Sequence, residues 1–156
     1  MMLWYHVTMK IKTKSEKETF NFGKKLVKKL KGGDVVGLIG ELGSGKTVLI
    51  KGIANGLGIN KTITSPTFVL MKIYKTKTKN KIKYLCHVDA YRVKNSMELI
   101  NIGIDDWLGK KNVLTVIEWA EKGEDILPKK SLIIKIKFGK RKNERKIEVE
   151  RIVDKI

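Results

Sequence analysis

The chain has 156 residues, enough for one domain with its own core, and we expect a single domain over residues 1–156. Hydrophobic residues make up 42% and charged residues 32%, which is typical of a globular protein and excludes a disordered tail. The longest uncharged stretch, residues 62–71, is too short to span a bilayer, so we expect no membrane segment. Because the chain has one cysteine and no signal-peptide pattern, the sequence predicts a cytoplasmic protein.

The net charge of +18 raises the question of a nucleic-acid partner, since phosphate backbones attract clustered basic residues. Thirty of the 34 basic residues are lysines and they are spread along the whole chain. Phosphate and nucleic-acid recognition favours arginine, whose guanidinium binds in a bidentate manner. The composition therefore favours a weak electrostatic attraction to RNA over tight direct binding.

Hydrophobic spacing and turn residues predict alternating strands and helices. Residues 5–12 should form an edge strand, and Ser15 with Glu18 forms a capping box that begins a helix ended by the glycine pair at 32–33. The later expected elements, in chain order, are strand 35–39, helix 46–57, strands 68–74 and 82–88, helix 96–102, strand 113–117, and an antiparallel pair at 132–138 and 146–153.

The segment between strand 35–39 and the following helix, G-E-L-G-S-G-K-T at residues 40–47, matches the complete P-loop pattern. Its glycines let the backbone curl around a phosphate, and the following helix begins with N–H groups that attract an anion. Lys46 is expected to contact the terminal phosphates, and the Thr47 hydroxyl to bind Mg²⁺. The residues expected to contact the nucleotide here are Glu41, Leu42, Gly43, Ser44, Gly45, Lys46, Thr47 and Val48.

With this motif in place, the element order predicts an α/β P-loop NTPase fold with a mostly parallel central sheet and antiparallel edge strands. Guanine-specific P-loop proteins usually carry N-K-x-D on a later strand. Neither Asn60-Lys61 nor Asn80-Lys81 is followed by the required aspartate, which favours ATP.

Two acids each end an apolar strand, Asp89 after residues 85–88 and Glu118 after residues 114–117. A P-loop enzyme needs carboxylates at this position to hold Mg²⁺ or orient water, so we expect both to act with Lys46 in catalysis. The sequence leaves open which acid lies closer to the metal.

Further candidates have two interpretations each. Thr67 could sense the terminal phosphate or simply form a turn, and Trp119 could flank the nucleotide or belong to the core. Arg92 could face a transition state or a partner, or form a salt bridge. Cys86 is interpreted as a buried small hydrophobe, and no Cys/His spacing indicates a zinc site.

Four blocks in this order resemble the TsaE (YjeE) family of small bacterial ATPases. They are L-G-S-G-K-T at 42–47, S-P-T-F at 65–68, H-x-D-x-Y-R at 87–92 and E-W-A-E at 118–121. Ser44 and Ala90 depart from the Ala and Leu that the family often has there. The resemblance implies that Asp89 and Glu118 serve Mg²⁺ and water, that Thr67 belongs to a switch-like loop, and that Trp119 lies beside the nucleotide.

The same resemblance implies a role in making threonylcarbamoyladenosine in tRNA. Family members bind the TsaB–TsaD pair, and their ATP hydrolysis is thought to reset that complex between turnovers. We expect a Mg²⁺-dependent ATP hydrolase that is slow alone, because no catalytic Gln or arginine finger is evident and a partner could supply the missing cation. Two alternatives stay open: a small-molecule kinase, and a basic RNA-binding protein with a regulatory nucleotide site.

Overall fold

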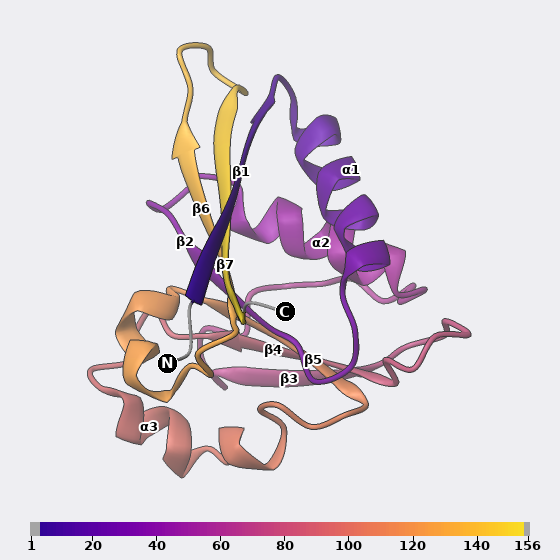
Figure 1. The fold of residues 1–156 in the computed structure, drawn as a ribbon, viewed down its shortest axis with the longest axis vertical. Coiled ribbons are helices and arrows are strands. Elements are labelled where there is room, and N and C mark those ends of the chain that lie inside the picture. The colour runs from indigo at the N-terminus through magenta and orange to yellow at the C-terminus, as the bar shows by residue number, and fades with distance from the viewer. Residues whose placement is uncertain (1–3, 155–156) are drawn as a thin grey trace.

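A seven-stranded mixed sheet with helices on both faces forms the centre of the molecule (Figure 1). The computed structural model describes residues 4–154. The strands are β1 (Trp4–Thr13), β2 (Val35–Ile39), β3 (Met71–Lys75), β4 (Tyr84–Asp89), β5 (Val113–Glu118), β6 (Leu132–Phe138) and β7 (Arg145–Asp154). The helices are α1 (Glu16–Leu26), α2 (Lys46–Gly56) and α3 (Ser96–Asn101), with 3₁₀ segments at Val27–Lys29, Ile104–Asp106 and Ala120–Ile126.

The strand order is β1-β7-β6-β2-β5-β4-β3. The four central strands β6, β2, β5 and β4 run parallel, whereas β1, β7 and β3 pair antiparallel with their neighbours. This confirms the predicted α/β fold, with a parallel centre and antiparallel edges. Because the carboxyl ends of β2, β4 and β5 meet at one edge, the P-loop and both predicted acids lie together.

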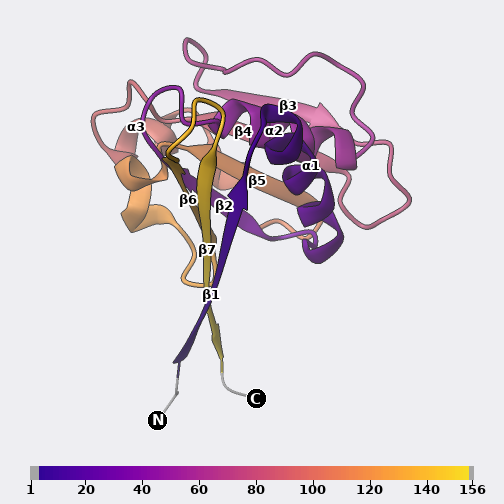
Figure 2. The same cartoon turned by 90° about the horizontal axis from the view of Figure 1, so that it is seen from above.

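Side chains that alternate along β2 build two cores on opposite faces of the sheet. Val36 and Leu38 pack against α1 and α2, whereas Val35 packs in the cluster that contains Leu99 of α3. Figure 2 shows α1 and α2 on one side of the sheet and α3 on the other. A strand covered on both faces needs apolar residues at every position, which explains the continuous apolar run of β2. Among the described residues, no helix is long and apolar enough to cross a membrane.

The predicted start of α1 is confirmed in its main feature. Ser15 is the N-cap, and its side chain accepts a hydrogen bond from the Glu18 N–H at 3.1 Å. The Glu18 carboxylate reaches back one residue further than expected, to the Lys14 N–H at 2.7 Å.

The predicted strand at 68–74 is wrong in its first half, because β3 begins only at Met71. Residues 67–69 form a turn in which the Leu70 N–H donates to the carbonyl of Pro66, and Leu70 itself has a positive φ of 63°. Phe68 was predicted to begin this strand, but it lies outside the sheet and is 86% exposed.

Helices α1 and α2 pack closely against each other, and glycines stand at their contact. A Cβ atom at Gly52 of α2 would lie 2.1 Å from the Phe20 carbonyl oxygen of α1, and one at Gly23 would lie 2.4 Å from the Leu49 carbonyl oxygen. Both contacts are with backbone, which cannot rotate away. Glycine therefore sets the helix separation, and with it the position of α1 beside the P-loop helix.

We expect Gly52→Ala to lower the free energy of unfolding by about 1–3 kcal/mol, because the added methyl group forces the helices apart. In an ordinary helix interior the same change would stabilise by about 1 kcal/mol, so the sign distinguishes the two cases. Urea unfolding checks it, with Lys51→Ala at the exposed neighbouring position as the control. A Gly52→Ala protein as stable as the wild type would contradict the tight helix contact.

Candidate functional site

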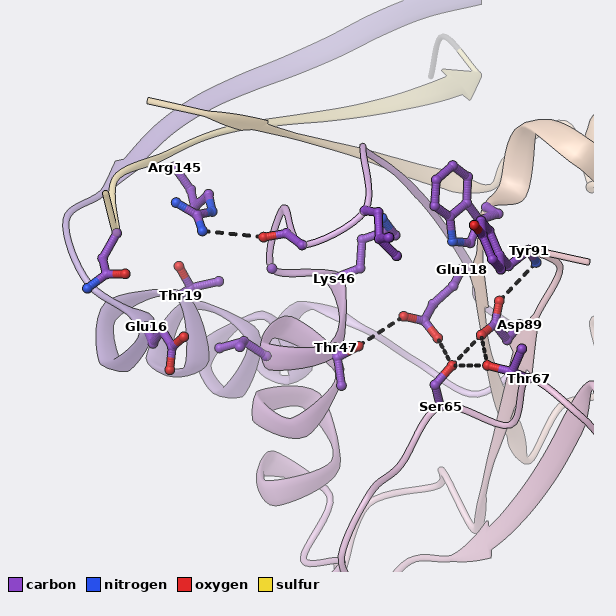
Figure 3. Close-up of a pocket in the computed structure, with 16 residues that line it drawn as sticks. Glu16, Thr19, Lys46, Thr47, Ser65, Thr67, Asp89, Tyr91, Glu118 and Arg145 are labelled. Atoms are coloured by element: carbon purple, nitrogen blue, oxygen red, sulfur yellow. Dashed lines mark hydrogen bonds between the residues drawn. The ribbon is translucent and has the colours of Figure 1, made fainter. Parts of the chain in front are cut away.

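The P-loop connects β2 to α2 and adopts the conformation that its glycines predict. Gly43 and Gly45 have φ values of 77° and 109°, in the left-handed region that favours glycine. A Cβ at Gly40 would lie 2.6 Å from the Ile136 carbonyl oxygen, so this position also needs glycine for close packing against β6. The loop wraps over the N-terminus of α2, beside the side chains that line the cleft (Figure 3).

Lys46 lies under this loop and is only 5% exposed. Its ammonium donates hydrogen bonds to the carbonyls of Gly40 and Glu41, the latter at 2.9 Å, and lies 4.3 Å from the centroid of the Trp119 ring. Burial lowers the pKa of Lys46, and the nearby carboxylates, with Glu118 the largest contributor, oppose that shift. A buried cation of this kind gains energy when a phosphate pairs with it.

Both predicted acids lie side by side at the carboxyl ends of neighbouring strands. Asp89 of β4 is in register with Glu118 of β5, and both are nearly buried, at 4% and 3% exposed. The Thr47 hydroxyl donates to Glu118 Oε1 at 3.4 Å. The Thr67 hydroxyl donates to Asp89 Oδ2 at 3.1 Å, so Thr67 belongs to the acidic cluster as well as to a turn.

Ser65 connects the two acids and was not predicted as a site residue. Its hydroxyl donates to Asp89 Oδ2 and also lies 3.4 Å from Glu118 Oε2. The only sequence signal for it is its place in the S-P-T-F block. Two carboxylates and three hydroxyls now converge on one point (Figure 3). Oxygen donors of this kind suit a hard cation such as Mg²⁺, completed by phosphate and water.

His87 fixes the orientation of Glu118 from inside the sheet. It is fully buried, and its Nε2 lies 3.0 Å from Glu118 Oε2. Sequence reasoning assigned it no role, although it stands two residues before Asp89 on the same face of β4. Cys86, on the opposite face, is fully buried, and burial raises the pKa of its thiol to about 12, which agrees with a small core residue.

Trp119 and Arg92 occupy different places around the cleft. Trp119 has a positive φ of 57°, and its ring packs against Tyr91 with centroids 5.0 Å apart. The same ring lies against the Lys46 ammonium, so Trp119 covers Lys46 within the cleft. Arg92 is exposed, and its guanidinium lies 4.9 Å from the Phe68 ring, outside the cleft.

The cleft has a volume of about 460 Å³, within the range of small-molecule sites. The predicted site residues that line it are Leu42, Gly43, Gly45, Lys46, Thr47, Val48, Thr67, Asp89, Glu118 and Trp119. Two predicted residues do not: Ser44 is fully buried beneath the loop, and Glu41 lines a second cleft on its other side.

Arg145 is a further lining residue, and no cation other than Lys46 was expected at the P-loop from the sequence. It comes from β7, at the end of the β6–β7 turn. Its Nε donates to the Ser44 carbonyl at 2.7 Å, and its Nη2 lies 3.4 Å from the Gly43 carbonyl. These contacts join β7 to the backbone of the P-loop at Gly43 and Ser44.

A family model and several known proteins are similar to most of this chain. The family model described as "Threonylcarbamoyl adenosine biosynthesis protein TsaE" matches residues 13–147. A Bacillus subtilis protein named tRNA threonylcarbamoyladenosine biosynthesis protein TsaE is 37% identical over 129 residues, 83% of this chain and 77% of that protein. A Treponema pallidum protein of the same name is 35% identical, covering 83% of this chain and 91% of its own.

The fold agrees as well. The crystal structure of Bacillus subtilis YdiB superposes with a TM-score of 0.77 at 32% identity, covering 96% of this chain and 88% of that one. The resemblance inferred from four sequence blocks is thus confirmed over most of the chain. The chain belongs to the TsaE family of threonylcarbamoyladenosine biosynthesis proteins.

Proposed function

We propose that this chain binds ATP with Mg²⁺ and hydrolyses it in the cytoplasm, as part of threonylcarbamoyladenosine synthesis on tRNA with a TsaB–TsaD pair. The observation that carries the proposal is the arrangement of one cleft. Lys46 and Thr47, at the start of α2, line it together with Asp89 and Glu118, at the ends of β4 and β5. These groups are of the kinds that bind the phosphates and Mg²⁺ in P-loop enzymes that transfer phosphate to water.

Each group has a distinct task. The P-loop N–H groups and the Lys46 ammonium bind the phosphates and stabilise charge that builds up on them. Thr47, Asp89 and Glu118 would hold Mg²⁺, which supplies neutralisation and alignment of the phosphate oxygens. Glu118 can also accept a hydrogen bond from the attacking water, because His87 keeps its carboxylate pointed into the cleft.

Two features support dependence on a partner. Exposed apolar side chains stand on the cleft lining and on the neighbouring turn: Leu42, which lines the cleft, is 71% exposed, and Phe68 and Val69, in the turn with Thr67, are 86% and 60% exposed. Apolar groups gathered beside a site suit a protein that closes over it. The second feature is that Arg92 lies outside the cleft and the Arg145 donors are used on P-loop carbonyls. A partner could therefore supply the missing transition-state cation.

The proposal is tested by measuring phosphate release from Mg–ATP, alone and with the TsaB–TsaD pair. We expect slow release alone and faster release with the partners. A pull-down with TsaB–TsaD, with and without ATP, should capture the wild type in a nucleotide-dependent manner, and Lys46→Ala should lose that dependence.

Three results would contradict the proposal. Rapid hydrolysis that gains nothing from TsaB–TsaD would remove the partner dependence. Transfer of phosphate to a metabolite instead of water would indicate a kinase. Tight, salt-sensitive tRNA binding that needs no partner and survives Lys46→Ala would indicate an RNA-binding protein with a regulatory nucleotide site.

A further inference from the structure

Lysines that are scattered in the sequence gather on one face of the sheet, where β1, β7 and β6 lie side by side. Side chains alternate along a strand, and Ile11, Ile136 and Ile147 pack in the core with α1 and α2. Their neighbours in the sequence point to the opposite face, which bears a groove of about 370 Å³. The charged residues that line this groove are Lys10, Lys12, Lys135, Lys137, Lys146 and Glu148.

One row across these three strands consists of lysines alone. Lys12 pairs in register with Lys146, and Lys146 with Lys137. Neighbouring strands are about 4.8 Å apart, and like charges directly opposite each other destabilise a sheet. In the adjacent row, by contrast, Glu148 stands between two lysines. The repulsion within the lysine row is relieved when an anion binds to it.

Few carboxylates neutralise the lysine row. Lys12 pairs with Glu144 at 3.1 Å. Lys137 and Lys146 are exposed, and neither has an ion-pair partner within residues 4–154. The row therefore presents two ammonium groups to the solvent that can pair with an external anion.

The turn beyond this row adds further cations. Residues 137–146, K-F-G-K-R-K-N-E-R-K, contain six basic residues and one acid, a formal charge of +5, whereas the whole chain of 156 residues carries +18. The one acid, Glu144, is 5% exposed and also accepts the Lys140 N–H at 3.1 Å, so it offers little negative charge to the solvent. The basic side chains at 140–142 are all exposed. The positive charge of the chain is thus concentrated at this turn and the adjoining row.

An aromatic ring lies among these cations. Phe138 is 47% exposed, and the Arg145 guanidinium lies 4.8 Å from its ring centroid. Clustered cations bind phosphate backbones, and exposed rings stack on unpaired bases, a combination that RNA matches and an acidic protein surface does not. A single exposed ring offers too little apolar surface to insert into a membrane. The chemistry of this face therefore favours RNA.

We infer that this basic surface, made of the groove lysines and the cations at 140–142, binds the phosphate backbone of tRNA. The binding is weak and independent of sequence, because lysines supply point charges to phosphates and do not read base edges. Lys135 and Lys137 also line the second cleft, beside Glu41 and Trp119, so RNA on this surface lies next to the P-loop. This inference rests on the proposed role in tRNA modification and adds the face of the chain that attracts the RNA.

Fluorescence anisotropy of a labelled tRNA, titrated with the full chain over a salt series without nucleotide or partners, tests the inference. We expect a Kd on the order of 10⁻⁶–10⁻⁴ M at physiological salt, and an affinity that falls at least about tenfold from about 50 to about 200 mM salt. The triple variant Lys10→Gln/Lys137→Gln/Lys146→Gln should bind at least about tenfold more weakly at low salt. Its slope of log K against log salt should be smaller by about 2. Arginine at the same three positions keeps the charge and should retain the binding.

The matched control is the triple variant Lys77→Gln/Lys79→Gln/Lys81→Gln. It removes the same charge from exposed lysines in the loop between β3 and β4, at the other edge of the sheet (Figure 1). Because these lysines lie far from the basic surface, the control should change tRNA affinity less than about twofold. Thermal unfolding of each variant verifies that the fold is retained.

Equal losses in the two glutamine triple variants would overturn the inference, because the net charge and not this surface would then attract the RNA. Binding to phosphatidylglycerol vesicles without binding to tRNA would overturn it in favour of a membrane. Loss of TsaB–TsaD capture with unchanged tRNA binding would overturn it in favour of a protein partner.

The inference and the proposed function can fail separately. A wild type that releases phosphate from Mg–ATP with TsaB–TsaD but binds no tRNA contradicts only the inference. A wild type that binds tRNA through this surface but does not hydrolyse ATP contradicts only the proposed function.

Discussion

Lys46→Ala should reduce ATP hydrolysis by at least about 100-fold, the scale of removing one preorganised charge donor from a phosphoryl-transfer site. Lys46 is 5% exposed and already desolvated, so its ammonium interacts strongly with any phosphate that enters the cleft. Alanine also removes the hydrogen bonds to the Gly40 and Glu41 carbonyls that hold the base of the loop. We therefore expect weaker ATP binding together with the lower turnover.

Steady-state phosphate release at saturating ATP, with and without TsaB–TsaD, measures this effect. The matched control is Lys51→Ala, which removes an exposed lysine from the same helix and should leave turnover unchanged. An Lys46→Ala protein that keeps more than about one-tenth of the activity would show that the P-loop lysine is not part of the reaction.

The parts of the site that could be predicted are those fixed by local chemistry. The P-loop glycines and Lys46 lie within eight consecutive residues, 40–47, and this spacing indicates a single backbone conformation. Asp89 and Glu118 could be predicted because the parallel-sheet rule puts the carboxyl ends of neighbouring strands together. Their register pairing confirms that expectation.

The residues missed by the sequence depend on tertiary contacts. Arg145 and Ser44, whose carbonyl it binds, are 101 positions apart in the sequence. No local sequence pattern predicts a contact between residues so far apart. In the sequence, His87 is one polar residue in an apolar strand. Its role becomes clear only from its contact with Glu118 on the neighbouring strand. Phe68 has a strong preference for strands, yet the turn at Pro66–Leu70 places it in solvent, so tertiary context overrode propensity.

Glu118→Gln should lower the rate of ATP hydrolysis by at least about 100-fold while the protein keeps its fold, because the charge is lost but the shape is retained. Glutamine can still face His87 Nε2, the Thr47 hydroxyl and the Ser65 hydroxyl, which contact the side chain now. The variant therefore isolates the negative charge that orients water and helps to hold Mg²⁺. ATP binding measured without Mg²⁺ should persist, since a negative group beside the phosphates has been removed.

Single-turnover hydrolysis and metal-free ATP binding, measured on the same preparation, separate these two effects. Glu124→Gln is the matched control, because Glu124 is an exposed acid in the 3₁₀ segment that follows β5 and should leave both quantities unchanged. Loss of metal-free ATP binding in Glu118→Gln would show that the carboxylate contributes to nucleotide affinity and not only to turnover. Retained turnover would contradict the role of Glu118 and indicate Asp89 as the acid that acts in the reaction. Asp89 is held in place by contacts with Ser65, Thr67 and the Tyr91 N–H.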